Sequence, residues 1–379
     1  MVDPRTSLTS AAVLFTLSTL VSAAPQESLR RVEDDGLRPL AEALAHVRAA
    51  RARGGGVAEA KARVQAACDE LAEATGTSDV LAQAADLARA QWLSWSYDVA
   101  PRERGTIVQG VHRAGFFAAE GLRYAVRVPE QYDPGRAWPL ILTVPEEGET
   151  PASHLRARWL DRDLLDSAIL FAPAMPAEQE DWDQVMVEGR PGGLAHLLSA
   201  HRIAAERLAV DPDRVFVVGR GKGVPAALAV GNYSPQRFAG IIGWAGAAGE
   251  LGPDNFGNLP TLFAGGSAQA RAFSDRAAEL GFDNSTIDPR ATEEVIWRWI
   301  QTHSRDPWPA EVRIVVGDPF PTRVHWLRVA PTAEKTSATA VVDRESGRIE
   351  ITCSGTSSVA LFLSDALVDL GRPVTFVCN

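Results

Sequence analysis

Cysteine is scarce in this sequence, with three residues in 379. No two of them have the close spacing of a zinc-binding pair, so we expect no metal site, and no motif calls for a cofactor. Cys68 lies in a helical pattern and is expected to be a small core residue. Cys353 and Cys378 both lie in strand-like segments. They could pair in an oxidising compartment, although free buried cysteines are common and the sequence leaves their separation open.

An excess of positive charge is also lacking, because the formal net charge is −10. An acidic chain gains no free energy from counterion release on a polyanion, which argues against a nucleic-acid partner. A ligand or partner is therefore expected to be a small molecule or a protein, and its identity stays open.

Long apolar runs are missing with one exception, residues 8–21, which follow Arg5. The run is shorter than the roughly 20 residues that span a bilayer. It ends at Val21-Ser22-Ala23, which fits a small-x-small cleavage site. We therefore predict a signal peptide over residues 1–23, export to the periplasm or the medium, and no membrane span after cleavage. An uncleaved N-terminal anchor is the alternative.

Three further regions follow the signal peptide. Residues 24–105 show apolar positions at helical spacing, as in Leu37, Leu40 and Leu44, with a third helix expected over 78–97. Residues 106–305 alternate strand-like and helix-like segments, which predicts a doubly wound, mainly parallel α/β sheet. Residues 306–379 contain strand-like segments with short polar connections and predict a small all-β domain. Asn379 directly follows a strand, which leaves open a longer natural C-terminus.

One glycine-rich turn joins a strand to a helix in VFVVGRGKGVPAALA, residues 215–229. A dinucleotide loop needs Gly-x-Gly-x-x-Gly, but position 224 is Val; a phosphate-binding Lys needs Ser or Thr after it, but Gly223 follows Lys222. The spacing does match the Gly-x-Ser-x-Gly turn that presents a catalytic nucleophile, with Gly221 in the nucleophile's place.

The residues before this turn strengthen the match. Asp211-Pro212-Asp213-Arg214 leads into the strand, and Tyr124-Ala125-Val126-Arg127-Val128-Pro129 and Trp138-Pro139-Leu140 precede it. This pattern resembles the α/β-hydrolase superfamily over about residues 106–305, in particular secreted esterases such as feruloyl esterases, polyhydroxyalkanoate depolymerases and prolyl-oligopeptidase-like domains. The resemblance implies a Ser-His-Asp triad and an oxyanion hole.

The positions that should carry this chemistry lack the necessary side chains. Gly221 replaces the nucleophile, Ala268 stands where the acid is expected, and residues 284–290 contain no His for the base. Pro145 and Glu146 open an acidic loop where the family usually has a His-Gly-rich oxyanion loop. The leading hypothesis is therefore a catalytically inactive hydrolase homologue that serves as a binding or scaffold module.

Two alternatives to this hypothesis stay open, a hydrolase with a relocated catalytic site and an anion-binding site. Ser267 or Ser285 could act with His112 or His154 in a hydrolase for carboxylic esters or peptides whose catalytic site is relocated.

A remnant of the cleft could instead bind a ligand. Arg220 and Lys222 beside a helix N-terminus could hold an anion. The candidate ligand-binding residues around this turn are Gly219, Arg220, Gly221, Lys222, Gly223, Pro145 and Glu146.

Overall fold

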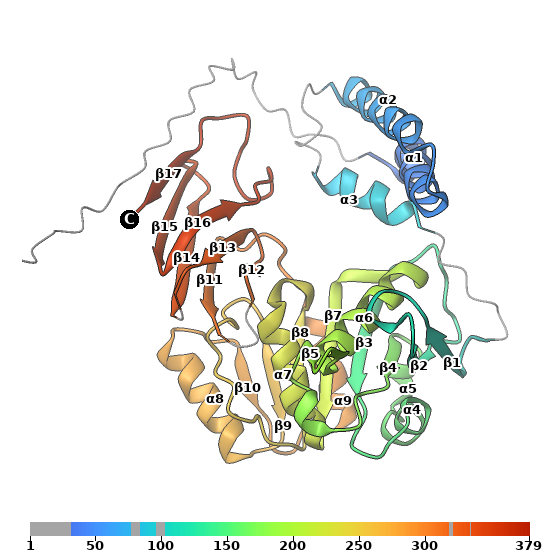
Figure 1. Cartoon of the computed structure of the whole chain (residues 1–379), viewed down its shortest axis with the longest axis vertical. Coiled ribbons are helices and arrows are strands. Elements are labelled where there is room, and N and C mark those ends of the chain that lie inside the picture. The colour runs from blue at the N-terminus through green and yellow to red at the C-terminus, as the bar shows by residue number, and fades with distance from the viewer. Residues whose placement is uncertain (1–31, 77–83, 96–102, 318–320, 334) are drawn as a thin grey trace, which may run out of the picture.

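The computed structural model describes residues 32–76, 84–95, 103–317, 321–333 and 335–379 (Figure 1). The predicted signal peptide lies outside the described residues, so its cleavage and the export of the chain stay predictions. Among the helices of the described residues, none combines the length and the apolar character needed to cross a bilayer.

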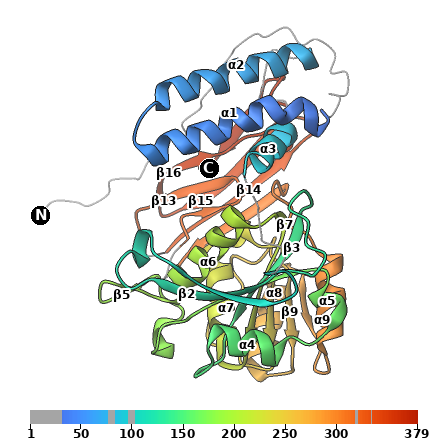
Figure 2. The ribbon, with the colours of Figure 1, turned by 90° about the vertical axis from the view of Figure 1, so that its right-hand side faces the viewer.

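The described part of the N-terminal region contains three helices, namely α1 (Asp34–Arg53), α2 (Val57–Thr75) and α3 (Ala84–Leu93). The predicted third helix was longer, and its first and last residues lie outside the described part. Helices α1 and α2 run side by side, and α3 packs across α1 (Figure 2). Leu37, Leu40 and Leu71 form their small apolar core, and the indole nitrogen of Trp92 donates to the carbonyl of Val210 at 3.1 Å.

The central domain is built on an eight-stranded sheet of order β1-β2-β4-β3-β7-β8-β9-β10. Strands β4, β3, β7, β8, β9 and β10 are parallel, whereas β2 runs antiparallel to both β1 and β4. The bounds are β1 (Ile107–His112), β2 (Leu122–Arg127), β3 (Trp138–Val144), β4 (Ile169–Pro173), β7 (Val210–Arg220), β8 (Gly240–Trp244), β9 (Thr261–Ala264) and β10 (Ser285–Ile287).

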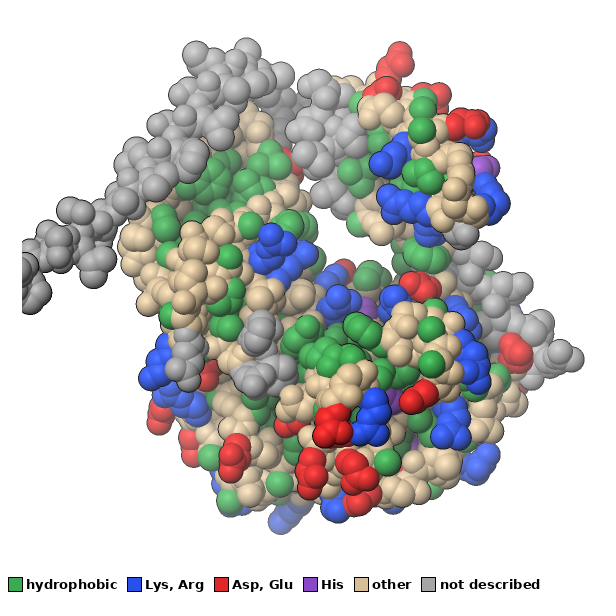
Figure 3. Space-filling view, in the orientation of Figure 1, with side chains coloured by type: hydrophobic (Ala, Val, Ile, Leu, Met, Phe, Trp, Pro, Cys, Tyr) green, Lys and Arg blue, Asp and Glu red, His purple; other side chains and the backbone are tan. Residues whose placement is uncertain are grey.

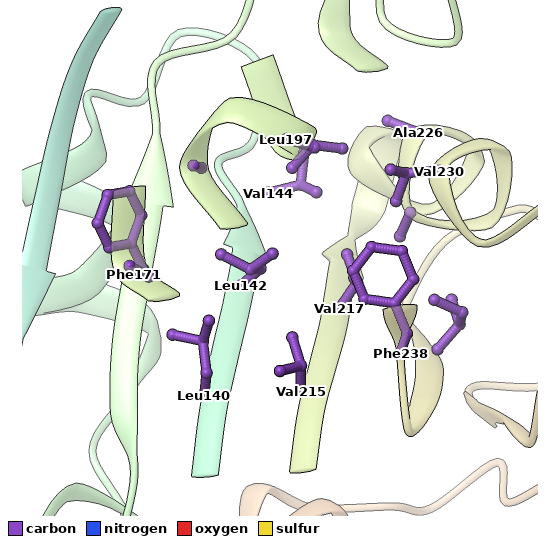
Figure 4. Close-up of a cluster of buried hydrophobic side chains, with 14 of the residues drawn as sticks. Leu140, Leu142, Val144, Phe171, Leu197, Val215, Val217, Ala226, Val230 and Phe238 are labelled. Atoms are coloured by element: carbon purple, nitrogen blue, oxygen red, sulfur yellow. The ribbon is translucent and has the colours of Figure 1, made fainter. Parts of the chain in front are cut away.

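Helices cover both faces of this sheet, and the strand residues alternate between the two apolar layers. Leu140, Leu142, Val215 and Val217 point to one layer (Figure 4), which α6 (Gly193–Arg207), α7 (Val224–Tyr233) and α8 (Ala268–Glu279) cover. The neighbours Ile141, Phe216 and Val218 point to the other layer. Helices α4 (Pro151–Arg158), α5 (Arg162–Leu165) and α9 (Glu293–Thr302) cover that layer. The doubly wound sheet predicted from the alternation of segments is confirmed.

The C-terminal region is a small β domain, whose described residues form two sheets of order β11-β14-β15-β17 and β12-β13-β16. Trp326 is fully buried in its core. Its strands are β11 (Glu311–Val316), β12 (Arg323–Val324), β13 (Leu327–Pro331), β14 (Thr336–Asp343), β15 (Arg348–Ser354), β16 (Thr356–Leu361) and β17 (Thr375–Cys378). The Asn255 side chain of the central domain binds both backbone groups of Val315, at 2.9 and 2.7 Å. Through Asn255, the central domain is therefore hydrogen-bonded to strand β11 of the C-terminal domain.

Several segments differ from the sequence prediction. The strand before the glycine-rich turn begins at Val210 instead of 215, residues 284–290 contain the short strand β10, and Ala268, the expected acid position, is the first residue of helix α8. Within the strand-like C-terminal region, β12 and β13 form a hairpin, because His325 adopts a φ of 44° and reverses the chain between them.

Two histidines predict a loss of stability in acid. Burial and the charges of Arg237 and Arg305 lower the pKa of His201 from its ordinary 6.5 to about 4, and burial with Arg305 lowers the pKa of His325 to about 4. Between these pH values the unfolded imidazoles bind more protons than the folded ones. The contribution of the two neutral histidines to the free energy of unfolding should therefore be fully present above pH 6.5. It should fall by on the order of 2–3 kcal/mol per histidine as the pH drops to 4.

Urea unfolding at pH 4, 5, 6 and 7 measures this effect. His325→Asn removes one of the two groups and keeps a residue that tolerates positive φ, so the variant should lose less stability across this window than the wild-type chain. An equal loss in both proteins would show that His325 does not contribute.

Candidate functional site

The turn that follows β7 has the strand-turn-helix context that the sequence predicts. Strand β7 ends at Arg220, a short 3-10 turn covers Gly221–Gly223, and α7 starts at Val224. At position 219 an added Cβ would lie 2.3 Å from the carbonyl oxygen of Gly223, and at position 221 φ is 52°. The turn is so sharp that its backbone leaves no room for a side chain at position 219. The backbone of Gly221 adopts a left-handed conformation, which favours glycine.

The space above Gly221 is occupied by a carboxylate. An ideal Cβ built on Gly221 would lie 2.6 Å from Oε1 of Glu146. Glu146 comes from the loop after β3, where the resemblance implies an oxyanion loop. A side chain at position 221 therefore requires Glu146 to move.

The acidic loop after β3 is held by basic side chains. Arg158 on α4 donates to Glu146 Oε2 and to Glu149 Oε1, both at 2.8 Å. Nε of Arg220 lies 3.8 Å from Glu146 Oε1, and its guanidinium stacks over the indole of Trp244 at 4.4 Å.

Lys222 forms an ion pair with Glu147. Figure 3 shows acidic and basic side chains interspersed over the lower part of the central domain. The charges of Arg220 and Lys222 thus face carboxylates, which weakens the anion-site hypothesis. That hypothesis and the ligand-binding roles expected for the residues around this turn stay predictions.

A chain of hydroxyl, imidazole and carboxylate, with its hydroxyl and imidazole buried, ends on Glu149 of this loop, and the sequence did not reveal it. Thr143 Oγ1 lies 2.7 Å from Nε2 of His154, whose Nδ1 lies 2.6 Å from Oε2 of Glu149. Thr143 is 1% exposed and His154 is 0% exposed. Trp159 Nε1 also donates to the Thr143 hydroxyl at 3.3 Å.

The electrostatics of this chain favour the neutral form of His154. Burial lowers the pKa of His154 and outweighs the neighbouring Glu149 carboxylate, which acts to raise it. Burial acts to raise the pKa of Glu149, but hydrogen bonds from His154, the Glu146 backbone and Arg158 outweigh it and leave this pKa below its ordinary value. A neutral imidazole then donates from Nδ1 to Glu149 and accepts the Thr143 hydroxyl at Nε2.

The remaining predicted site residues are separated in the described part of the chain. The Ser267 hydroxyl caps α8 by accepting from Ala270 N at 3.0 Å, so Ala268 is the first residue of a helix. The Ser285 hydroxyl binds Thr261 and Ser274, at 3.0 and 2.8 Å.

His112 lies 3.5 Å from an Arg202 nitrogen. The structure therefore pairs neither serine with His112 or His154. Among the described residues, no three His, Cys, Asp or Glu side chains gather as metal ligands would.

The strand order and the turn after β7 give this chain an α/β-hydrolase-like fold with a β region at its C-terminus. Solved structures that are similar to it include a thermostable esterase, with 17% identity, a TM-score of 0.42, and coverage of 52% of this chain and 63% of the esterase. Another is S-formylglutathione hydrolase from Staphylococcus aureus, with 9% identity, a TM-score of 0.40, and coverage of 52% and 97%.

A third is the CE1 ferulic acid esterase of the anaerobic fungus Anaeromyces mucronatus, with 14% identity, a TM-score of 0.40, and coverage of 52% and 90%. No protein-family model and no curated protein sequence matches the chain.

The contact between position 221 and Glu146 predicts a measurable coupling. Gly221→Ala should destabilise the protein by about 2–3 kcal/mol, because it combines a left-handed φ with the clash against Glu146. In a Glu146→Ala background the same substitution should cost about 1 kcal/mol less. Gly148→Ala is the matched control, since its φ is 80° and nothing lies within 4 Å of the added Cβ.

Chemical denaturation of the four proteins of this double-mutant cycle and of the control gives the coupling energy. A cost of Gly221→Ala that is unchanged by Glu146→Ala would contradict the contact.

Arg158 offers a second test of this loop. Arg158→Ala leaves Glu146 and Glu149 without their shared guanidinium and should lower the free energy of unfolding by about 1–2 kcal/mol. Arg156→Ala on the same helix removes an exposed guanidinium and should change stability by less than about 0.5 kcal/mol. Equal effects of the two substitutions would show that the ion pairs of Arg158 are not stabilising.

Proposed function

We propose that this chain is an exported α/β-hydrolase-like protein without acyl-transfer activity, a pseudo-hydrolase that serves as a binding or scaffold module. One observation carries the proposal: the carboxylate of Glu146 lies where the side chain of a nucleophile at position 221 would project. Glycine itself offers no attacking atom.

The surroundings of the turn support the same proposal. Acyl transfer requires hydrogen-bond donors aimed at a developing oxyanion, and a carboxylate at this place acts against the negative charge. The expected acid position is Ala268 at the start of a helix, and the loop after β10 carries Asp288-Pro289-Arg290 in place of a histidine.

The scaffold role rests on how the central domain holds its neighbours. Its strand β7 receives the Trp92 side chain of the N-terminal helices. Its Asn255 and Asn258 side chains bind the backbone of β11, Asn258 donating to the Glu311 carbonyl at 2.8 Å. A domain that organises two others in this way can present their surfaces to a partner without any chemistry of its own.

The alternative function, a hydrolase with a relocated site, is favoured by the Thr143–His154–Glu149 chain. Its groups follow the order of nucleophile, base and acid, at hydrogen-bonding distances. Its burial counts against this role, because the Thr143 hydroxyl and the His154 ring are enclosed by packed side chains and a substrate carbonyl has no approach. A structural role, linking β3, α4 and the acidic loop, accounts for the same contacts.

Hydrolysis of short-chain nitrophenyl esters and labelling by a fluorophosphonate probe test the proposal. The wild-type chain should hydrolyse the esters no faster than a non-enzymatic protein control, and it should not be labelled. Gly221→Ser should gain neither activity, since it restores neither the base nor the acid.

Thr143→Val separates the alternative from the proposal. Hydrolysis at enzyme-like rates that Thr143→Val abolishes, with unchanged melting temperature, would establish the relocated site. Enzyme-like hydrolysis that survives this substitution would also overturn the proposal.

A further inference from the structure

Strand β17 is an edge strand with little apolar packing. Within the described residues it pairs with β15 alone, in a parallel register that places Cys378 opposite Ile351. All four of its residues are exposed. A short parallel edge strand gains only a few ladder hydrogen bonds. Hydrogen bonding and packing therefore stabilise the pairing of β17 with β15 only weakly.

Two cysteines lie across this pair of strands. The Sγ atoms of Cys353 on β15 and Cys378 on β17 are 4.0 Å apart. Cys353 is two positions beyond Ile351, the partner of Cys378, so both thiols point to the same face of the sheet. The backbone NH of Cys353 also donates to the side chain of Asn379 at 2.9 Å, which holds the two chain segments together.

We propose that Cys353 and Cys378 form a disulfide that covalently ties β17 to β15. The register offsets the two cysteines by two positions, so closing the 4.0 Å gap between the sulfurs takes a shift of the chain end along β15 as well as a rotation of each side chain, and the exposed edge strand β17 allows that shift. This inference is independent of the proposed function. It needs only that the chain meets an oxidising disulfide, as the predicted export would provide.

The chemistry is thiol-disulfide exchange. The exposed thiolate of Cys378 attacks the disulfide of an oxidant, forming a mixed disulfide and releasing one thiol. The thiolate of Cys353 then attacks the Cys378 sulfur and displaces the second thiol. The two cysteines lose two electrons and two protons, and the oxidant's disulfide is reduced to two thiols.

The bond would have a structural consequence at the sheet edge. It closes the segment of residues 354–377, which carries β16, and keeps the outer backbone of β15 covered. In the reduced chain β17 can detach, and the unpaired edge of β15 is then open to strand addition by a second copy.

The full-length chain, incubated with oxidised glutathione and then freed of it, tests the proposal. Denaturation and alkylation with iodoacetamide should modify Cys68 alone, and protease digestion should yield a crosslinked peptide containing Cys353 and Cys378. Reduction should make all three cysteines available to alkylation. Alkylation of Cys353 and Cys378 in the oxidised protein, or a crosslink that includes Cys68, would overturn the proposal.

Stability gives an independent measurement with matched variants. Reduction should lower the unfolding temperature of the wild-type chain by several degrees, on the order of 5 °C. Cys353→Ser should unfold at the lower temperature whether or not reductant is present, and Cys68→Ser should behave as wild type. An unfolding temperature that reduction does not change in the wild-type chain would contradict a tether of β17.

Discussion

The close packing around strand β7 constrains the turn that follows it and, through that turn, the rest of the central domain. This strand lies between β3 and β8, and its residues Val215 to Val218 are fully buried between the helices on both faces. At its end the chain must reverse into α7 within a few residues. An added Cβ would lie 2.3 Å from a backbone oxygen at position 219, and 2.0 Å from the Gly221 carbonyl at position 246. Glycine is required at these positions by the sheet geometry, whatever chemistry the turn carries.

The acidic loop after β3 depends on the same turn. A carboxylate in a partly buried position is costly unless an opposite charge and hydrogen bonds compensate it. Glu146 meets Arg158 and Arg220, and Glu149 meets Arg158 and His154. The loop therefore lies against the turn as a set of mutually compensated charges. A ligand that entered here would have to break these pairs.

The sequence predicted the fold well because the fold rests on local patterns. The parallel strands are apolar runs, and the helices between them show helical periodicity, so the doubly wound sheet follows. The helix α8 was missed although Ala270, Phe273 and Ala277 form a buried stripe at helical spacing. Strand β10 has three residues, too few for a period to be visible.

The site was predictable only in part. The spacing of Gly219, Gly221 and Gly223 identified the turn, because the motif is contiguous. The contact of Glu146 with position 221 joins residues that are far apart along the chain, and it depends on how β3 and β7 pair. His154 was a candidate base from its residue type, but its partners Thr143 and Glu149 emerge only when α4 packs against the sheet.

The left-handed backbone at position 221 connects stability with the proposed loss of chemistry. A serine nucleophile in this conformation carries backbone strain that an enzyme tolerates for its function. Glycine adopts the same φ at little steric cost, so a chain released from catalysis gains stability by this replacement. Once the side chain is gone, the space it leaves can accept the Glu146 carboxylate, and the pairing with Arg158 and Arg220 stabilises it there. A serine at position 221 would have to displace a compensated carboxylate as well as bear the backbone strain, so under the proposed function this one substitution restores no catalytic site.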